Sequence, residues 1–237
     1  MRAGISTLLL ILISLLMVGI LAAIFGDTLL LPFTPYVPTE ATMGIVQRIF
    51  YFHVPAAMVS FLAFFVTFCA SGLYLFTKGL FWDNLASAST EVGVLFCTIV
   101  LVTGPIWARP VWGVWWTWEP RLTTTLVLWL LYVAYLLLRT YTENREQQAR
   151  FSAVMGIVAF LDVPIVYFSV RWWRGVHPIV FGPQGGGLAP RMEHVFSLSI
   201  LLFLLLYALL LWHRTHLAWL EDRIESLQPN RLQAGSR

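Results

Sequence analysis

Five of the eleven tryptophans lie within one short stretch, between Trp107 and Trp118. They belong to the segment W-A-R-P-V-W-G-V-W-W-T-W-E-P-R-L-T-T, which continues to Thr124 and carries two arginines, Arg109 and Arg121. Indole rings provide broad, flat apolar surfaces, and a guanidinium binds a carboxylate through two parallel hydrogen bonds. This combination suits a planar hydrophobic ligand that carries carboxylate groups.

The spacing of the tryptophans predicts how they are displayed. If the residues from Val111 to Glu119 form a helix, the period of 3.6 residues gathers most of the aromatic side chains on one face. Pro110 stands where a proline can open such a helix, and Pro120 would end or kink it. The predicted face comprises Trp112, Trp115, Trp116 and Glu119, while Trp118 points elsewhere.

An aromatic belt at the membrane surface is the alternative interpretation of these tryptophans. Belt tryptophans are usually scattered over several helix ends, whereas here they are concentrated in one connection. We therefore favour a ligand-binding surface.

Two histidines, His53 and His177, add a second kind of chemistry. Neutral imidazole is a good iron ligand, and two axial histidines would hold a haem from both sides. His177 follows the run R-W-W-R, so Arg174 joins Arg109 and Arg121 as a possible partner of the haem propionates. Either histidine alone is more often an interfacial polar group; the prediction rests on both lying on the same side of the membrane as the tryptophans.

The composition indicates that the helices carrying these residues lie in a lipid bilayer. Apolar residues make up 59% of the 237 positions and charged residues only 11%, with a mean hydropathy of +0.77. Soluble domains carry about a quarter charged residues, so this is an integral protein of the lipid bilayer. The net charge of +3 is spread over the connections, which gives no basis for binding nucleic acid.

Six stretches are long and apolar enough to span a bilayer, which takes about 20 residues. They are Ile5–Phe25, Phe50–Thr77, Leu85–Ile106, Leu122–Thr140, Phe151–Val170 and Val195–Trp212. The connections are short, so the prediction is an all-α polytopic membrane protein with a single six-helix domain over residues 1–237. The Trp-rich helix or loop at 107–124 lies outside, and a tail from about residue 214 to 237 lies in the cytoplasm.

The basic residues predict the orientation. With a cytoplasmic N-terminus, nine of the 15 lysines and arginines fall on the inside and six on the outside, as the positive-inside rule requires. Both termini are then cytoplasmic, and the Trp-rich segment and both candidate histidines face the opposite compartment.

The residues resemble a known family. The stretch W-G-V-W-W-T-W-E-P-R-L-T-T is similar to W-G-x-x-W-x-W-D-x-R-L-T, the signature of the haem-handling membrane proteins of cytochrome c maturation. Glu119 replaces the aspartate of that pattern, keeping the charge on a longer arm. The segments F-Y-F-H-V-P-A-A and S-V-R-W-W-R-G-V-H look like the two histidine regions that flank the signature. The matching positions are Trp112, Gly113, Trp116, Trp118, Arg121, Leu122 and Thr123.

Within this family, the length of the chain and its six predicted spans are most similar to the smallest branch, the haem exporter protein C (CcmC) type. The resemblance implies a non-enzymatic haem carrier of the bacterial cytoplasmic membrane, which holds haem on the periplasmic face between His53 and His177. It also implies transfer of the haem to the chaperone CcmE, with the ABC-transporter subunits CcmA and CcmB and the small subunit CcmD as partners. The residues expected around the haem are Trp112, Trp115, Trp116, Trp118, Glu119, Arg121, Arg109 and Arg174.

Two other functions are compatible with parts of the sequence. A haem lyase-type enzyme would form thioether bonds, but the larger relatives of that kind carry additional spans and histidines that this chain lacks. A subunit that contains no haem and docks a partner through its tryptophans is the second alternative, because aromatic residues and arginine are enriched at protein interfaces.

Overall fold

The computed structural model describes residues 2–25, 36–173, 175, 177 and 187–234. Its regular elements are all helical, with no β-strand in this part of the chain. Their order along the chain is α1 (Arg2–Phe25), the 3-10 helix η1 (Ile45–Ile49), α2 (Phe50–Thr77), α3 (Leu80–Trp112), α4 (Pro120–Tyr141), α5 (Arg145–Phe160), α6 (Asp162–Trp172) and α7 (Pro190–Ala234).

Six helical segments of the described chain are long and apolar enough to cross a membrane. The chain is therefore a multi-pass, all-helical membrane protein, and the predicted fold class is confirmed. The segments are Leu8–Phe25, Ile45–Thr77, Leu80–Trp112, Pro120–Tyr141, Arg145–Trp172 and Pro190–Ile224.

The fifth span differs from the prediction, because it consists of two helices rather than one. α5 ends at Phe160 and α6 begins at Asp162. Pro164 explains the break: a proline lacks an N–H and its ring clashes with the carbonyl four residues earlier, here that of Phe160.

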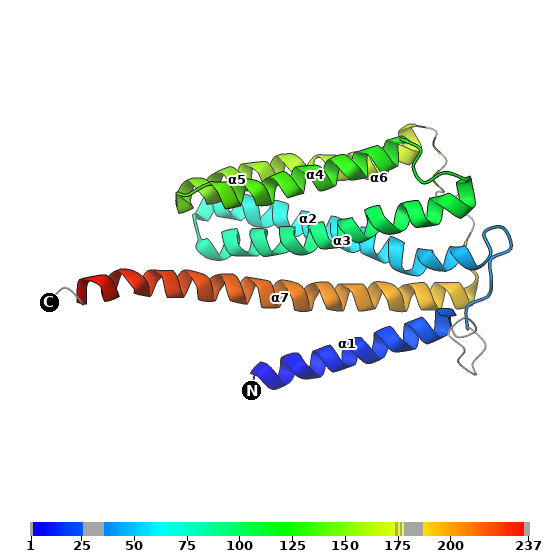
Figure 1. The fold of residues 1–237 in the computed structure, drawn as a ribbon, viewed down its shortest axis with the longest axis horizontal. Helices are drawn as coiled ribbons and strands as arrows, with labels where there is room; N and C mark the ends of the chain where they lie inside the picture. Colours follow the sequence, from blue (N-terminus) through cyan, green and yellow to red (C-terminus); the bar gives the residue numbers. More distant parts are fainter. Residues whose placement is uncertain (1, 26–35, 174, 176, 178–186, 235–237) are drawn as a thin grey trace.

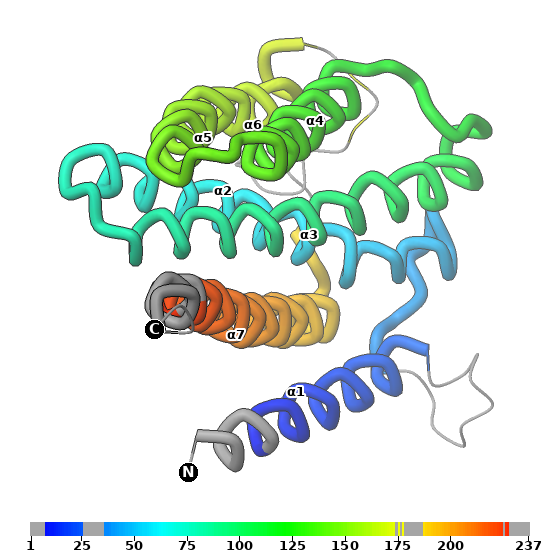
Figure 2. Tube along the Cα trace, turned by 60° about the vertical axis from the view of Figure 1, so that its left-hand side comes forward, coloured from blue at the N-terminus to red at the C-terminus, as the bar shows by residue number. Residues whose placement is uncertain are grey.

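The helices form layers (Figure 1). α2 and α3 form a central antiparallel hairpin, with α4, α5 and α6 on one side of it and α7 on the other. α1 packs on α7 at the edge of the bundle, as the turned view also shows (Figure 2).

A close contact between α2 and α3 holds the centre together. A Cβ atom on Gly93 would lie 2.7 Å from Cε1 of Phe64, so only glycine fits at this crossing. Phe64 also stacks on Tyr132 of α4, with ring centroids 3.8 Å apart. One buried ring thus joins three helices.

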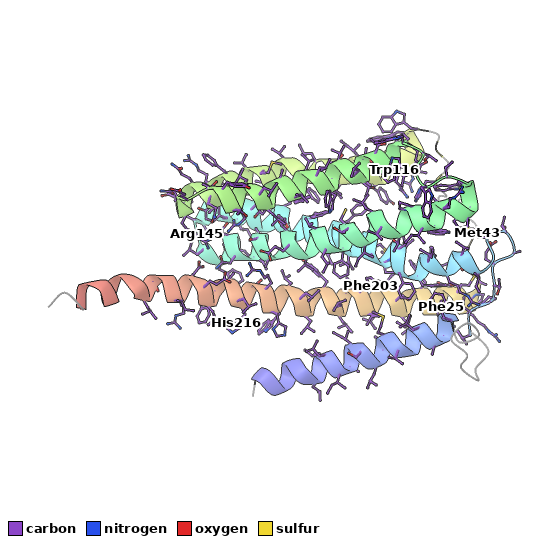
Figure 3. The ribbon with its side chains drawn as sticks, viewed as in Figure 1. Phe25, Met43, Trp116, Arg145, Phe203 and His216 are labelled. Atoms are coloured by element: carbon purple, nitrogen blue, oxygen red, sulfur yellow. The ribbon has the colours of Figure 1, made fainter. Side chains whose placement is uncertain are left out.

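Ion pairs tie the helices together at the end of the bundle opposite the Trp-rich segment. Figure 3 labels Arg145 and Trp116 at these two ends. The pairs join α3 to α4, α5 to α7, and α3 to α7: Asp83–Arg139, Arg145–Asp222 and Glu91–Arg214.

Candidate functional site

The prediction of a helix from Val111 to Glu119 is wrong. α3 continues through Pro105 and Pro110 to Trp112, and Gly113 ends it with a positive φ of 77°. Glycine adopts this left-handed conformation without steric penalty, which makes it a common helix terminator. The N–H of Gly113 donates to the carbonyl of Arg109 at 3.0 Å, closing the last turn.

Residues 113–119 form an irregular connection, after which Pro120 opens α4. A proline in the first helical turn removes an N–H that would have no partner within the helix. Pro120 therefore begins a helix here, where the sequence analysis expected it to end one.

The tryptophans consequently do not share a helical face. Trp112 and Trp116 are half-buried, whereas Trp115 and Trp118 are 58% and 70% exposed. Trp118 has a positive φ of 54°, which is uncommon for a residue with a bulky side chain. Two tryptophans thus turn towards the bundle and two turn away from it.

His53 lies in the first turn of α2 and is 8% exposed. Its Nδ1 is 2.8 Å from Oγ1 of Thr103 on α3. The ring of Trp107, one turn further along α3, meets the imidazole edge-on with centroids 5.7 Å apart.

His177 follows α6 and is held by Glu119. The imidazole Nδ1 lies 3.0 Å from Oε1 of the carboxylate, and the His177 backbone N–H donates to Oε2 at 3.2 Å. Gly175 makes room for this contact, because a Cβ there would lie 2.4 Å from Oε2. The ring of Trp112 covers the imidazole at 5.8 Å. The carboxylate of Glu119, in the Trp-rich signature, therefore holds His177, one of the two predicted iron ligands, in place.

Both histidines line one cavity of about 350 Å³ between α2, α3, α4 and α6, within the range usual for small-molecule sites. Polar groups of the lining include the two imidazoles and the guanidinium groups of Arg121 and Arg171. Trp116 also lines the cavity. Further into the bundle the lining is mostly apolar and includes Ala57, Met58, Phe61, Val100 and Val166.

The predicted arginines have different positions. Arg121 lines the cavity and donates to the Tyr167 carbonyl at 3.2 Å, while its Nε is buried without a hydrogen-bond partner in the described part of the chain. Arg109 is exposed and donates to the Gly113 carbonyl, away from the cavity lining. Arg174 lies outside the described residues.

Three residues of the site escaped the sequence analysis as site residues: Thr103, Trp107 and Arg171. Arg171 lines the cavity and lies over the ring of Tyr167 at 5.4 Å. Arg171 belongs to the same R-W-W-R run as Arg174, and this run was the sequence feature from which its place at the site could have been predicted. Thr103 and Trp107 are four residues apart on α3, a spacing that places them on one helix face, but contact with His53 depends on how α2 and α3 pack.

The described residues contain no group of three or more His, Cys, Asp or Glu side chains that could hold a metal ion together. Any metal at this cavity would therefore take at most two of its ligands from these side chains. Two axial imidazoles suit an iron whose four equatorial ligands come from a macrocycle.

Comparison with known proteins gives one consistent family. The family model for CcmC, "Heme exporter protein C", matches residues 5–230. The chain is 34% identical over 180 residues to "Heme exporter protein C" of Escherichia coli K12, covering 74% of this chain and 71% of that protein.

Relatives from other organisms give the same result. "Heme exporter protein C" of Bradyrhizobium diazoefficiens is 31% identical over 196 residues, which cover 81% of this chain and 73% of that protein. A "Putative cytochrome c biosynthesis ccmC-like mitochondrial protein" of Marchantia polymorpha is 34% identical over 140 residues, 59% of each chain. This chain belongs to the heme exporter protein C family.

Proposed function

We propose that this protein binds haem in the cavity between His53 and His177 and delivers it to the chaperone CcmE during cytochrome c maturation. The observation that carries the proposal is the convergence of two histidines, 124 positions apart in the sequence, on one cavity. Haem is the cargo in this proposal, and the protein does not alter it chemically.

The polarity of the cavity matches the two parts of a haem molecule. The macrocycle is apolar and fits the part lined by Ala57, Phe61 and Val166. The propionates are anionic and would pair with Arg121 and Arg171, since guanidinium groups bind carboxylates bidentately. The buried Nε of Arg121 has no hydrogen-bond partner among the described residues, and a propionate would supply one.

The histidine anchor supports ligation of iron at this position. The Glu119 carboxylate can only accept a hydrogen bond, so it holds the proton of His177 on Nδ1 and leaves the Nε2 lone pair free. A carboxylate behind a ligating histidine fixes the tautomer and raises the basicity of the ligand. We infer that Glu119 performs this task, with its longer arm in place of the aspartate of the family pattern.

Exposed aromatic rings adjoin the site and suit a transfer step. Trp115 and Trp118 are largely exposed and lie within two residues of Trp116, which lines the cavity. Aromatic side chains are enriched at protein interfaces, so we infer that they contact the chaperone. In this proposal the cavity faces the periplasm, both termini are cytoplasmic, and CcmA, CcmB and CcmD form the complex around this subunit.

A transfer assay tests the proposal. The purified protein, loaded with haem in detergent, is mixed with haem-free CcmE, and the two are separated before the haem in each is measured. We expect haem to move to CcmE from the wild type and from the Arg109→Gln variant, which changes an arginine outside the cavity. Failure of the purified protein to take up haem would instead indicate a docking subunit. If apocytochrome c is added and its cysteine thiols form thioether bonds with the haem vinyl groups, the protein is a lyase.

A further inference from the structure

One stretch of α3 encloses the imidazole of His53. Thr103 contacts Nδ1 at 2.8 Å, and Trp107 covers the ring edge. Gly104 lies so close that a Cβ on it would be 3.4 Å from Cε1 of the imidazole. The ring is therefore held by packing on its α3 side, and one polar contact determines the position of its proton.

The hydrogen bonds of Thr103 define that position. Its Oγ1 lies 2.7 Å from the carbonyl oxygen of Ile99, one turn earlier in α3, and 3.5 Å from that of Val100. A carbonyl can only accept, so the single hydroxyl hydrogen of Thr103 is directed at its own helix. Towards His53 the hydroxyl oxygen is then an acceptor, and Nδ1 must carry the proton.

The consequence for His53 is a free lone pair on Nε2. Nitrogen binds iron through a lone pair, and a neutral imidazole has only one, on the nitrogen without the proton. Without an acceptor at Thr103, the proton is free to occupy Nε2 and thereby block this nitrogen. His177 has the corresponding arrangement with a carboxylate, whereas His53 has a neutral hydroxyl.

We propose that Thr103 is a positioning residue for His53: its hydroxyl oxygen holds the proton on Nδ1 and keeps Nε2 available as an iron ligand. The role in iron binding rests on the proposed function. The tautomer, in contrast, is a property of the protein without haem, and the two can be tested separately.

The tautomer of His53 is measured by NMR of the haem-free protein labelled with ¹⁵N-histidine. The chain has only five histidines, so the spectrum contains few signals. The His53→Gln variant identifies the His53 signals. We expect the Nδ1–H form in the wild type and in Thr103→Ser, and a mixture or the Nε2–H form in Thr103→Val. An Nε2–H wild type, or a Thr103→Val spectrum equal to that of the wild type, would overturn the inference.

The effect on the ligand is measured by optical spectroscopy of the haem-loaded variants. Loss of an outer partner of a metal ligand typically costs 10- to 100-fold in affinity, and for a neutral partner we expect about 10-fold weaker binding and partial loss of the low-spin spectrum in Thr103→Val. Thr103→Ser keeps the hydroxyl, so it should have the haem affinity and the low-spin spectrum of the wild type. Thr140→Val is the matched control, because the Thr140 hydroxyl donates to the Leu136 carbonyl of its own helix, far from the cavity.

The outcomes separate this inference from the proposed function. A low-spin spectrum that persists unchanged in Thr103→Val refutes the role of Thr103 and leaves two-histidine binding intact. A wild type without a two-histidine spectrum refutes the proposed function and the ligand role together, and the NMR result still decides the tautomer.

Discussion

At the scale of single residues, Glu119 determines where His177 lies. Its two carboxylate oxygens accept from the imidazole and from the backbone N–H of the same histidine. The carboxylate is 8% exposed, so water competes little for these hydrogen bonds. The glutamate thus links the Trp-rich connection to the segment after α6 and sets the geometry of one proposed iron ligand.

Replacing Glu119 with glutamine tests this link. Glu119→Gln keeps the size of the side chain and removes the charge behind the histidine. We expect haem affinity to fall about 10- to 100-fold, the usual effect of losing such a partner. Haem loss to an excess of apomyoglobin measures the change. Glu193→Gln, in the exposed first turn of α7, is the control, and equal haem retention in both variants would contradict the role of Glu119.

Gly175 provides a second test that leaves the carboxylate in place. An added methyl group would overlap Oε2 of Glu119, at 2.4 Å from the new Cβ. We expect Gly175→Ala to displace the carboxylate and to weaken haem binding in the same assay by about as much as Glu119→Gln. Gly187→Ala, at an exposed position with nothing within 4 Å of the new Cβ, should bind haem as the wild type does. Normal binding by Gly175→Ala would show that the carboxylate contact is dispensable.

At the scale of elements, the close packing of α2 on α3 positions His53 against Thr103 and Trp107. Gly93 lies at a close contact between them, where a Cβ would meet the ring of Phe64. The register of the two helices fixes which α3 side chains face the histidine.

Enlarging this contact should destabilise the bundle. We expect Gly93→Ala to lower the free energy of unfolding by about 1–3 kcal/mol, the usual cost of overpacking a core. Thermal unfolding in detergent measures it. Gly72→Ala, where the new Cβ has nothing within 4 Å, should leave stability unchanged or raise it, because alanine favours a helix over glycine. Equal melting temperatures for the two variants would contradict the packing argument.

Long apolar stretches predicted the six membrane spans correctly, whereas the roles expected for Pro110 and Pro120 were wrong. The second span, Phe50–Thr77, agrees with α2 residue for residue. The helix from Val111 to Glu119 failed because helical periodicity carries no information on where a helix ends. Gly113 was the local signal for that end, and its role as a helix terminator was overlooked.

The sequence singled out His53, His177 and Arg121, which line one cavity in the structure, but it did not predict their surroundings. Thr103 and Trp107 are ordinary residues of an apolar span, and only the packing of α3 on α2 brings them to His53. Arg109 was expected, with Arg121, to pair with the haem propionates, and in the structure its side chain donates to the Gly113 carbonyl at the end of α3. The contacts of Thr103 and Trp107 with His53 are tertiary, and the spacing of residues along one helix does not encode them.

At the scale of the whole molecule, the two ends of the bundle have different chemistry. One end carries the cavity and the Trp-rich connection, and the other carries the ion pairs that join α3, α4, α5 and α7. α7 has 45 residues, a length of roughly 68 Å at 1.5 Å per residue, against a hydrocarbon core of about 30 Å. Its C-terminal part extends beyond the rest of the bundle at the ion-pair end (Figure 1).

The predicted orientation assigns these ends to different compartments. In a background with Cys69 and Cys97 replaced by alanine, Trp118→Cys should react with a membrane-impermeant maleimide in intact spheroplasts. Arg223→Cys, on the exposed face of α7 at the other end, should react only after permeabilisation. The reverse pattern would place the cavity on the cytoplasmic side.

Iron binding by His53 and His177 is tested by an optical spectrum of the haem-loaded protein. We expect a low-spin spectrum for the wild type that is lost or altered in both His53→Ala and His177→Ala. His194 lies near the start of α7 and does not line the cavity, so we expect His194→Ala to retain the wild-type spectrum. A wild type without haem, or a low-spin spectrum that survives in either His53→Ala or His177→Ala, would overturn two-histidine binding.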